Sequence, residues 1–566
     1  MTILIDSQRS SEGVQPRRWP VGLALVLLLI LWFGALEYRD LFHPDEGRYA
    51  EIPHEMVASG DWITPRLNDL KYFEKPVLQY WITAVAYKLL GEDEWTARLW
   101  PAVSGLLTLF LVYLTGKRLS GRRAGIAAAL FLASTFEFFV FSQVLTLDMG
   151  LTFFMTLVLS TFIVSQDTRC SPLQRRNWAM GIWIAMALAM LSKGLVGLML
   201  PGLVFVAYIV VERDWKMFGR VHWLPGVLVF LAIAMPWFVW VQIRNPEFFQ
   251  FFFIHEHFGR YVSTLHHRSG GWYYFLMMLL IGSVPWTFAY AAALKRAWRD
   301  PAPDHFEVKP FRLLVLWVVV ITGFYSLSQS KLPGYIVPVY PTLALLLGCA
   351  VSDGRFRLSF RHLFGIGAAG GVLAIVAPFI THVPKFAADA DLIRLYVPWI
   401  IAAGLSLAAT AVLGLSLFRS RYRYVLPVVA LGSLVAFQLV VAGTQSIANQ
   451  FSAEDLVERA QARNGRFKLG APFYSIGMYD QTLPLHIGHP VTIVAYQDEF
   501  AMGIGQEPER AIATINRFRQ QWFLERQAYA IMSPRQFAEE QNIGTPMVVL
   551  YANQRAILVA RRNLAE

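Results

Sequence analysis

The segment LFHPDEGRYAEIPHEM, residues 41–56, has the composition of a reaction centre. It places acids, an arginine and a histidine directly after a hydrophobic run, where a plain loop at a bilayer surface needs no such charge density. Adjacent residues of a helix point about 100° apart, so Asp45 and Glu46 need not share one role. One of them can act as a base or stabilise a cation. Alternatively, Asp45 follows Pro44 and precedes a helical pattern, which is typical of a helix N-terminal cap.

A second segment, YFEKPVLQYW at residues 72–81, places Glu74 and Lys75 before a proline. Lys75 can bind an anionic head group there, or it can extend to lipid phosphates without a catalytic role. Asp148, in SQVLTLDMG, lies at the outer end of a predicted membrane span. An acid in that place is costly unless water, a partner or a ligand meets it. Glu137, in STFEFF, is a second acid of this kind.

Residues 242–272 are rich in histidine, and His255 and His257 flank a glutamate. Imidazole and carboxylate groups suit Zn²⁺ or Mn²⁺. The run HEHFG is not the HExxH motif of zinc proteases, however, because Gly259 stands where the second histidine would be. Solvated or phosphate-binding histidines are the alternative. Arg260, which aromatic residues flank, is well suited to bidentate phosphate binding.

A fourth segment, SQSKLPGYIVPVYP at residues 328–341, joins two apolar runs. It places Lys331 and Tyr335 at the predicted membrane surface. Pro333 and Gly334 interrupt a helix and expose backbone amides there. Tyr335 can bind a phosphate, or it can serve only as an interfacial anchor.

The composition is that of a membrane protein with many spans. Of the 566 residues, 55% are hydrophobic and only 16% are charged, whereas soluble domains carry about 25% charged residues. The net charge of +11 is explained by lysines and arginines that collect in cytoplasmic loops. We find no soluble basic domain, so nucleic acid is not an expected partner. Cys170 and Cys349 lie far apart in the sequence, which disfavours a disulfide framework.

The apolar runs predict about 13 transmembrane helices. The predicted spans lie near residues 20–38, 100–117, 124–142, 149–165, 178–192, 194–211, 222–241, 273–293, 312–328, 334–351, 362–381, 392–417 and 424–442. Every second loop is basic, as in KRLSGRR and RSRYRY, and the loops between them carry little positive charge. This alternation assigns the basic side to the cytoplasm. Lys193 and Gly194 mark the turn that separates two spans in a run too long for a single crossing.

The predicted organisation has two domains. Residues 1–442 form a transmembrane domain, and two outward loops, 39–99 and 242–272, form a roof over its active site. The first loop contains two amphipathic segments, DEGRYAEIPHEMVAS and KPVLQYWITAVAYKLL, that predict helices at the membrane interface, or alternatively a plug for the bundle. Residues 443–566 form a small α/β domain outside the membrane, with helices in EDLVERAQARN and EPERAIATINRFRQQWFLERQ and a hairpin around ANQR. This domain has no nucleophile, phosphate-loop or metal motif, which favours a lid or accessory role.

The inventory of cations, acids and interfacial helices on one membrane face favours an enzyme for an anionic, lipid-linked substrate. The sequence has no Walker motif, Rossmann fingerprint or other nucleotide loop. A transporter of lipid-linked sugars is a second class to consider. Transporters favour inverted repeats and broken helices at the membrane midplane, whereas this chain shows no repeat and its charges lie at one face.

The run HPDEGRYAEIPHEMVASGDWITPRLNDLKYFEKPVLQYW, together with SKLPGY, resembles the ArnT-like lipid A aminoarabinose transferases. These belong to glycosyltransferase family 83, in the GT-C superfamily that includes protein O-mannosyltransferases. The resemblance covers the whole chain. It implies a mainly α-helical polytopic GT-C fold with a small periplasmic α/β domain, in the bacterial inner membrane, with the active site on the periplasmic side.

The resemblance also implies a function. The donor would be undecaprenyl phosphate carrying 4-amino-4-deoxy-L-arabinose, and the acceptor a phosphate of lipid A in lipopolysaccharide, with inversion at the sugar. The product would confer resistance to polymyxin and cationic peptides. The alternative is a related GT-C enzyme that moves mannose or another sugar from a polyprenyl phosphate to protein or lipid. Membrane lipids are the other expected partners, and a monomer is expected.

The predicted roles follow from charge. The acceptor phosphate is already ionised, so the harder task is to stabilise the leaving phosphate. The predicted site comprises catalytic Asp45, Glu46 and Asp148; phosphate-binding Lys75, Arg260, Tyr335 and Lys331; and supporting Arg48, Tyr49, Tyr72 and Glu74. No cofactor is expected to be required. A divalent metal such as Zn²⁺, if one binds, would be held by Glu74, His255 and His257.

Overall fold

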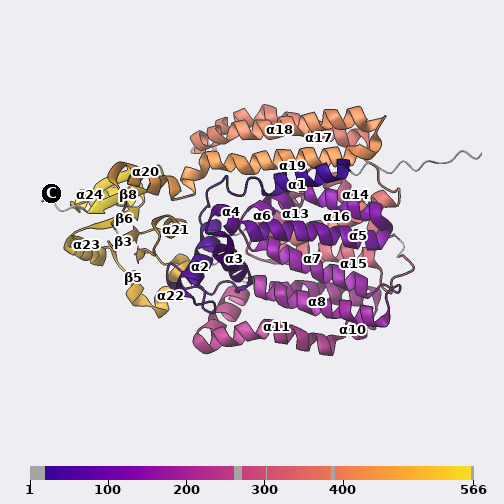
Figure 1. The fold of residues 1–566 in the computed structure, drawn as a ribbon, viewed down its shortest axis with the longest axis horizontal. Coiled ribbons are helices and arrows are strands. Elements are labelled where there is room, and N and C mark those ends of the chain that lie inside the picture. The colour runs from indigo at the N-terminus through magenta and orange to yellow at the C-terminus, as the bar shows by residue number, and fades with distance from the viewer. Residues whose placement is uncertain (1–18, 260–269, 301–302, 384–388, 469, 562–566) are drawn as a thin grey trace, which may run out of the picture.

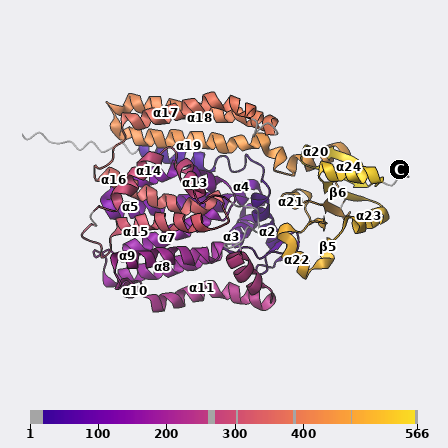
Figure 2. The same cartoon turned by 180° about the vertical axis from the view of Figure 1, so that it is seen from behind.

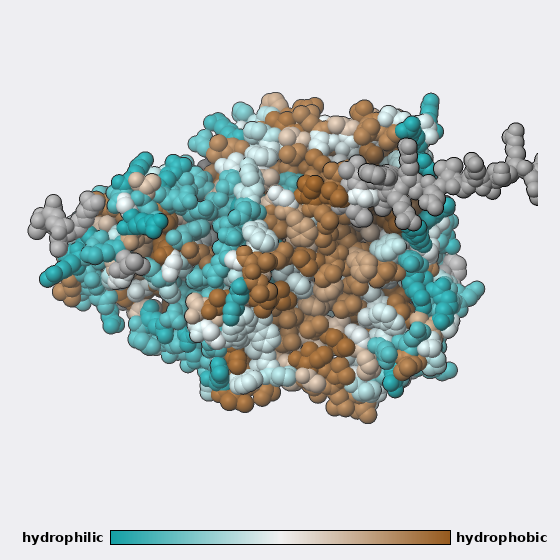
Figure 3. Space-filling view, in the orientation of Figure 1, coloured by the Kyte–Doolittle hydropathy of each residue, from teal (hydrophilic) through white to brown (hydrophobic). Residues whose placement is uncertain are grey.

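The computed structural model describes residues 19–259, 270–300, 303–383, 389–468 and 470–561. Most of the described chain is a bundle of long helices, and a smaller domain with a β-sheet adjoins one end of it (Figures 1 and 2). The space-filling view shows a broad apolar band across the visible face of the bundle, with hydrophilic surfaces at both ends (Figure 3). This distribution is that of a multi-pass membrane protein.

The helices of the bundle overlap all of the predicted spans. They are α1 Trp19–Phe33, α5 Leu99–Ala133, α6 Phe136–Gln143, α7 Asp148–Ser165, α8 Pro172–Lys193, α9 Val196–Glu212, α10 Met217–Arg220, α11 Trp223–Arg244, η1 Gln250–Gly259, α13 Tyr274–Gly282, α14 Thr287–Ala297, α15 Pro310–Leu327, η2 Pro333–Val339, α16 Tyr340–Ser352, α17 Phe360–Val376, η3 Ala377–His382, α18 Ala390–Phe418, η5 Tyr422–Tyr424, α19 Val425–Gly443 and η6 Thr444–Gln450.

Judged by length and composition, the described residues contain fewer membrane-spanning helices than the sequence predicts. Among the described residues, 8 helices are long and apolar enough to cross a membrane, or 9 if one bent pair counts as a single span. The predicted count of 13 is therefore not confirmed. One source of the difference is α5, which is a hairpin of two helices because Ser120 and Gly121 leave the helical conformation. The predicted turn after Lys193 is confirmed, since α8 ends there and Gly194 adopts a φ of +84°.

The bent pair, α13 and α14, turns by 113° between Gly282 and Thr287. Pro285 lies in this break and has no backbone N–H to continue the helical hydrogen bonds. Gly282 packs so closely against Glu137 and Tyr340 that a Cβ atom would overlap them. The predicted span at 273–293 is thus a broken helix in the structure.

The segment between α1 and α5 forms the layer that joins the bundle to the C-terminal domain. It contains α2 Asp45–Ser59, the short strands β1 Arg66–Leu67 and β2 Leu70–Lys71, α3 Leu78–Leu90 and α4 Glu94–Ala97. The two helices predicted in this loop are confirmed. Nine of the residues of α2 are buried, including polar ones, because the helix packs between α3, the segment of Arg98 and the C-terminal domain (Figure 1).

The C-terminal domain is an α/β domain, as predicted. Its elements are α20 Glu454–Asn464, β3 Phe473–Ile476, α21 Leu483–Ile487, β4 Thr492–Val494, η7 Asp498–Phe500, α22 Ala501–Gln506, η8 Pro508–Arg510, β5 Ala511–Ile512, α23 Ile515–Leu524, β6 Ala528–Met532, α24 Pro534–Ile543, β7 Val548–Ala552 and β8 Ile557–Arg561. The strand order is β5-β4-β3-β6-β8-β7, parallel from β5 to β6 and antiparallel for β8 and β7.

Two of the three element predictions for this domain are confirmed, and one needs a correction. Helix α20 coincides with EDLVERAQARN, and β7 and β8 form the predicted hairpin, in which Ala552 pairs with Ile557. The predicted helix over residues 507–527 is wrong at its start, because residues 511–512 pair with β4 as an edge strand and α23 begins only at Ile515. The hydroxyl of Thr514 caps α23 by accepting from the Arg517 backbone N–H.

Candidate active site

Asp45 is the first residue of α2, at the end of the bundle that faces the C-terminal domain. The N-cap position belongs to Pro44, whose side chain cannot accept a hydrogen bond, so the capping alternative for Asp45 does not describe this helix start. Instead, Asp45 Oδ1 accepts from Arg48 Nη1 at 3.1 Å. The Asp45 side chain remains 44% exposed, which leaves its carboxylate accessible to a substrate.

Arg48 links this acid to the C-terminal domain. Its Nε lies 2.6 Å from Glu499 Oε2, and both side chains are buried. Its guanidinium also stands 5.9 Å from the ring centre of Tyr49 and 5.8 Å from that of Tyr72. Burial raises the pKa of Glu499, and the charge of Arg48 opposes this rise. Arg48, Tyr49 and Tyr72 therefore form one cluster with Asp45, as supporting residues would.

Glu46 has a different environment from its neighbour. Both of its oxygens accept from the fully buried Arg98, at 2.8 and 2.9 Å, and Arg39 lies 3.6 Å away. The backbone N–H groups of Phe42 and Leu145 also donate to this carboxylate. Burial alone would raise the pKa of Glu46, but the charges of Arg98 and Arg39 outweigh it and hold the pKa at about 2.

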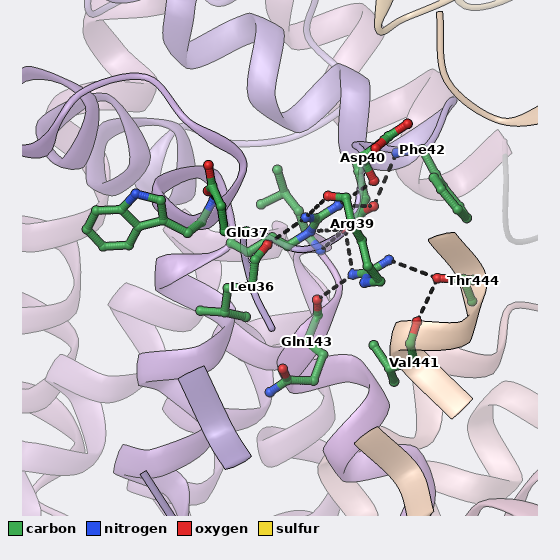
Figure 4. A network of polar contacts seen from close by, with 12 residues as sticks. Leu36, Glu37, Arg39, Asp40, Phe42, Gln143, Val441 and Thr444 are labelled. Atoms are coloured by element: carbon green, nitrogen blue, oxygen red, sulfur yellow. Dashed lines mark hydrogen bonds and ion pairs between the residues drawn. The ribbon is translucent and has the colours of Figure 1, made fainter. Parts of the chain in front are cut away.

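The ion cluster of Glu46, Arg98 and Arg39 connects four segments of the chain. Arg98 donates further to the backbone carbonyls of Leu36, Arg39 and Asp40. Arg39 reaches the carbonyl of Gln143 at the end of α6 and the hydroxyl of Thr444 in η6, as Figure 4 shows. With every oxygen engaged and the residue only 2% exposed, the structure gives Glu46 a positioning role for α2. No atom of Glu46 is accessible for the predicted catalytic role.

Asp148 begins α7 and forms an ion pair with Lys193 at the end of α8. Both side chains are about nine-tenths buried. Lys193 Nζ stands 5.1 Å from the ring centre of Tyr335, close enough for a cation–π contact. Gly334 packs directly against the Asp148 carboxyl, so the SKLPGY segment needs a glycine at this position. The structure thus brings the predicted Asp148 and Tyr335 together, with a lysine between them.

Glu137, the second acid predicted within a span, lies near the broken helix. Its Oε2 accepts from the hydroxyl of Tyr340 at 2.6 Å, and the side chain is buried. This hydrogen bond satisfies part of the carboxyl inside the bundle, as a buried polar group requires.

Lys75 follows α2 and lies between two acids. Its Nζ is 3.7 Å from Glu74 Oε2 and 3.8 Å from Glu256 Oε2 of η1. It also donates to the Glu74 carbonyl at 3.0 Å. The Lys75 side chain is 15% exposed. The structure therefore joins the two outward loops at this lysine, as the predicted roof over the site requires.

The predicted metal ligands are only partly described. His255 stacks on Phe251 in η1, with ring centres 5.4 Å apart. The side chain of His257 and the whole of Arg260 lie outside the described residues. Within the described part of the chain, no three His, Cys, Asp or Glu side chains are arranged to hold a metal ion. The metal and the role of Arg260 therefore stay predictions.

Lys331 is buried beside an aromatic ring rather than beside an acid. Its Nζ donates to the carbonyls of Tyr325 and Ser326, at 3.0 and 2.7 Å, and stands 5.3 Å from the ring centre of Phe275. Burial lowers its pKa. Two carbonyl acceptors leave one N–H direction for a phosphate, so the predicted role is compatible with this geometry.

The C-terminal domain packs directly on the α2 layer. Asn68, between β1 and β2, exchanges two hydrogen bonds of 2.7 Å with the backbone of Val491. Arg66 pairs with both oxygens of Glu507 at 3.0 Å. Gly47 of α2 lies against the backbone of Gln481 so closely that a Cβ atom would overlap it. This interface holds Glu499 in place beside Arg48.

Two residues that contact the predicted site residues, Lys193 and Glu499, are not among those predicted from the sequence. The sequence indicates Lys193 only as a turn marker, although a lone lysine in an apolar run is also a signal of a functional residue. Glu499 lies more than 440 positions from Asp45 in the sequence. We find no local signal around it, because its partner is set only by how the C-terminal domain packs.

These features define a polytopic membrane enzyme of the GT-C type with an extramembranous α/β domain, and comparisons with known proteins identify the family. The family model described as dolichyl-phosphate-mannose-protein mannosyltransferase matches residues 19–252. The model described as the aminoarabinose transferase C-terminal domain matches residues 459–561. The first covers the α2 layer, and the second covers most of the sheet domain.

Relatives and solved structures agree with these matches. An undecaprenyl phosphate-alpha-4-amino-4-deoxy-L-arabinose arabinosyl transferase of Pseudomonas paraeruginosa is 30% identical over 79% of this chain and 81% of its own length. A transferase of the same name from Pseudomonas fluorescens is 32% identical over 64% of each chain. That match thus spans less than two thirds of the relative.

Crystal structures of ArnT from Cupriavidus metallidurans superpose with TM-scores of 0.90, for the form bound to undecaprenyl phosphate, and 0.88, for the apo state. Both are 36% identical and cover 96% of this chain and 98% of theirs. The chain therefore belongs to the ArnT family of membrane aminoarabinose transferases.

Proposed function

We propose that this protein transfers 4-amino-4-deoxy-L-arabinose from undecaprenyl phosphate to a phosphate group of lipid A. The observation that carries the proposal is the match to the ArnT structure that binds undecaprenyl phosphate, which extends over nearly the whole of both chains. Asp45, Glu74 and Asp148 all lie within electrostatic reach of Tyr49, while Lys75 lies beside Glu74 and Lys193 links Asp148 to Tyr335. These contacts support the proposal. We place this end at the periplasmic face of the bacterial inner membrane, because the opposite loops are the basic ones.

In this reaction the bond between the sugar C1 and the donor phosphate oxygen breaks, and a bond from C1 to an acceptor phosphate oxygen forms. The negative charge passes from the acceptor phosphate to the leaving polyprenyl phosphate, so no net proton transfer is required. Stabilising the leaving charge is the main task. Lys75 supplies a cation for it at the junction of the two outward loops. Tyr335 and Lys331 complete this phosphate clamp, and the predicted role of Arg260 belongs to the same clamp.

Asp45 supplies the exposed carboxylate of the site. It can orient the acceptor, or it can hold the ammonium group of the donor sugar. Its bond to Arg48 fixes the carboxylate on the first turn of α2. Attack on the side of C1 opposite the leaving phosphate inverts that carbon. A monomer is the proposed working unit.

The test is the mass of lipid A from a polymyxin-sensitive, transferase-null bacterium that still makes the aminoarabinose carrier. The wild-type chain should add an aminopentose to lipid A and restore polymyxin resistance. Asp45→Asn and Lys75→Ala should each reduce the modified fraction at least about 100-fold, the size of effect seen when one charge-stabilising group is removed.

Asp391→Asn is a matched control. Asp391 also lies in the first turn of a helix and pairs with an arginine three residues on, Arg394, but both side chains are largely exposed. This variant should modify lipid A like the wild type. A well-expressed, membrane-inserted wild-type chain that adds no aminopentose would refute the proposed sugar and acceptor. Near-normal turnover by Lys75→Ala would refute the phosphate clamp.

Transfer of mannose or another sugar to protein is the second candidate. The match of residues 19–252 to the mannosyltransferase family model favours it. The match of residues 459–561 to the aminoarabinose transferase C-terminal domain favours the first candidate. A hexose increment on envelope proteins, with unmodified lipid A, would select the second.

A further inference from the structure

A groove of about 700 Å³ lies between α5, α7 and α8, at the end of the bundle opposite the C-terminal domain (Figure 1). It is far from the candidate active site. Asp148 begins α7 and Ser165 ends it, and 18 residues of helix span about 27 Å. Its lining comes from the first half of α5, from α7, from the start of α8 and from the loop between α7 and α8.

One end of this groove is cationic. Lys117 and Arg118 end the first half of α5, and Arg169 comes from the loop between α7 and α8. The fully buried Asp167 lies between the two arginines, 2.5 Å from Arg118 Nε and 2.6 Å from Arg169 Nη2. Three cations against one carboxylate leave a net charge of +2. The Arg118 and Arg169 side chains remain 34% and 49% exposed, and Lys117 is exposed as well.

Asp167 therefore positions the cations rather than cancelling them. Arg169 places its Nε and Nη2 on both oxygens of Asp167 and also donates to the Arg118 carbonyl at 3.2 Å. Arg118 Nη2 reaches the Cys170 sulfur at 2.8 Å. The two guanidinium groups are thus held side by side before any ligand arrives, which lowers the entropic cost of binding an anion.

Beyond the cations, the groove wall combines leucines with the small hydroxyl side chains of Thr115, Ser160 and Thr161, and it belongs to the membrane-facing surface. Leu111, Leu114 and Leu157 line it along the helices, and Leu114 is 41% exposed. Trp178, near the start of α8, is 44% exposed. A tryptophan at the end of a membrane helix typically lies at the level of lipid head groups. The cations therefore lie at the head-group level, and the leucines lie at the level of acyl chains.

We infer that this groove binds an anionic phospholipid, whose phosphate lies against Lys117, Arg118 and Arg169 and whose acyl chain lies along Leu111, Leu114 and Leu157. The charge selects an anionic over a zwitterionic head group. The apolar wall selects a lipid over a soluble phosphate compound, which would leave that wall uncovered. The inference does not depend on the proposed function, since the groove lies on the opposite face from the transferase site.

The experiment is native mass spectrometry of the full-length chain, released from detergent with phosphatidylglycerol or phosphatidylcholine of identical acyl chains. The wild type should retain phosphatidylglycerol in preference to phosphatidylcholine. Lys117→Glu takes the local charge from +2 to zero and should weaken phosphatidylglycerol binding about tenfold. Leu114→Trp fills the apolar part of the groove at an exposed position and should weaken it as well.

The matched control is Lys295→Glu. Lys295 is an exposed lysine near the end of α14, outside the groove, and this variant should retain phosphatidylglycerol like the wild type. Thermal unfolding midpoints equal to the wild type check that each variant is folded. Equal retention of both lipids, or retention that Lys117→Glu does not change, would overturn the inference. Displacement of the lipid by glycerol phosphate at equal concentration would overturn the lipid as occupant and assign the cations to a soluble phosphate.

Discussion

Replacing Glu46 by glutamine removes one charge from the most deeply buried ion cluster of the α2 layer and keeps its shape. The carboxylate accepts two hydrogen bonds from Arg98, which is 0% exposed, and lies 3.6 Å from Arg39. After the substitution, two buried arginines face no carboxylate. We therefore expect Glu46→Gln to destabilise the protein rather than to slow its chemistry alone.

The size of the effect follows from two independent arguments. Breaking a buried ion pair by removing one partner costs about 3–5 kcal/mol, because the remaining charge is left buried and unpaired. The fall in the pKa of Glu46 from 4.5 to about 2 corresponds to about 3 kcal/mol of stabilisation by the folded state. For a chain of 566 residues, both predict a loss of roughly 2–4 °C in the unfolding midpoint.

The pH dependence has a defined sign. Because the folded-state pKa of Glu46 lies below its usual value of 4.5, its contribution to stability is present above pH 4.5. It is lost as the pH falls from 4.5 through about 2. Wild-type stability should drop over that interval, and the difference between wild type and Glu46→Gln should shrink there.

The assay is thermal unfolding of the detergent-solubilised chain, followed with a dye that fluoresces on reaction with thiols. Cys349 is 2% exposed and becomes reactive on unfolding. Asp45→Asn is the control, since the Asp45 side chain is 44% exposed and its loss should change the midpoint little while it abolishes transfer. A Glu46→Gln protein with a wild-type midpoint and no activity would refute this reasoning and give Glu46 a catalytic role.

Two further predictions concern the contact between the α2 layer and the C-terminal domain. Burial raises the pKa of Glu55 to about 8 and that of neighbouring Glu51 well above its usual value, so the contribution of these two acids to stability should be fully present below pH 4.5 and be lost as the pH rises through 8. Glu55→Gln should flatten this decline in a series of unfolding midpoints, and an unchanged slope would contradict the assignment. Glu507→Ala breaks the bidentate pair with Arg66 and should cost about 1 kcal/mol, seen as faster limited proteolysis between the two domains. The exposed neighbour Glu509 is the control, and equal cleavage of Glu507→Ala and Glu509→Ala would show that the pair does not hold the interface.

Local patterns predict the bounds of two helices, α2 and α20, to the residue. The charged amphipathic run after the first span predicts the helix that the structure shows at Asp45–Ser59, since a 3.6-residue period and a proline at the start are local properties. The hairpin of β7 and β8 was equally readable from two apolar runs around a turn. The edge strand β5 was not, because two residues take a strand conformation only when β4 lies beside them.

The adjacent acids Asp45 and Glu46 show what local sequence patterns cannot predict. Asp45 and Glu46 look alike in the sequence, yet one is exposed beside Arg48 and the other is enclosed by Arg98 and Arg39. Helical geometry predicts only that they point in different directions. Glu46 is enclosed because Arg98, which is 52 positions along the chain, packs against it.

The sequence by itself determined that this is a polytopic membrane protein with an outer α/β domain, and it pointed to the charged segments where a site would form. Hydropathy, charge alternation and short motifs are properties of contiguous residues, so they can be read without coordinates. Only the tertiary structure decided that Glu499 reaches Arg48, that Lys193 stands between Asp148 and Tyr335, and that Glu46 is withdrawn from the site. These pairings join residues that are distant in sequence, and packing of the helices and of the C-terminal domain brings them together.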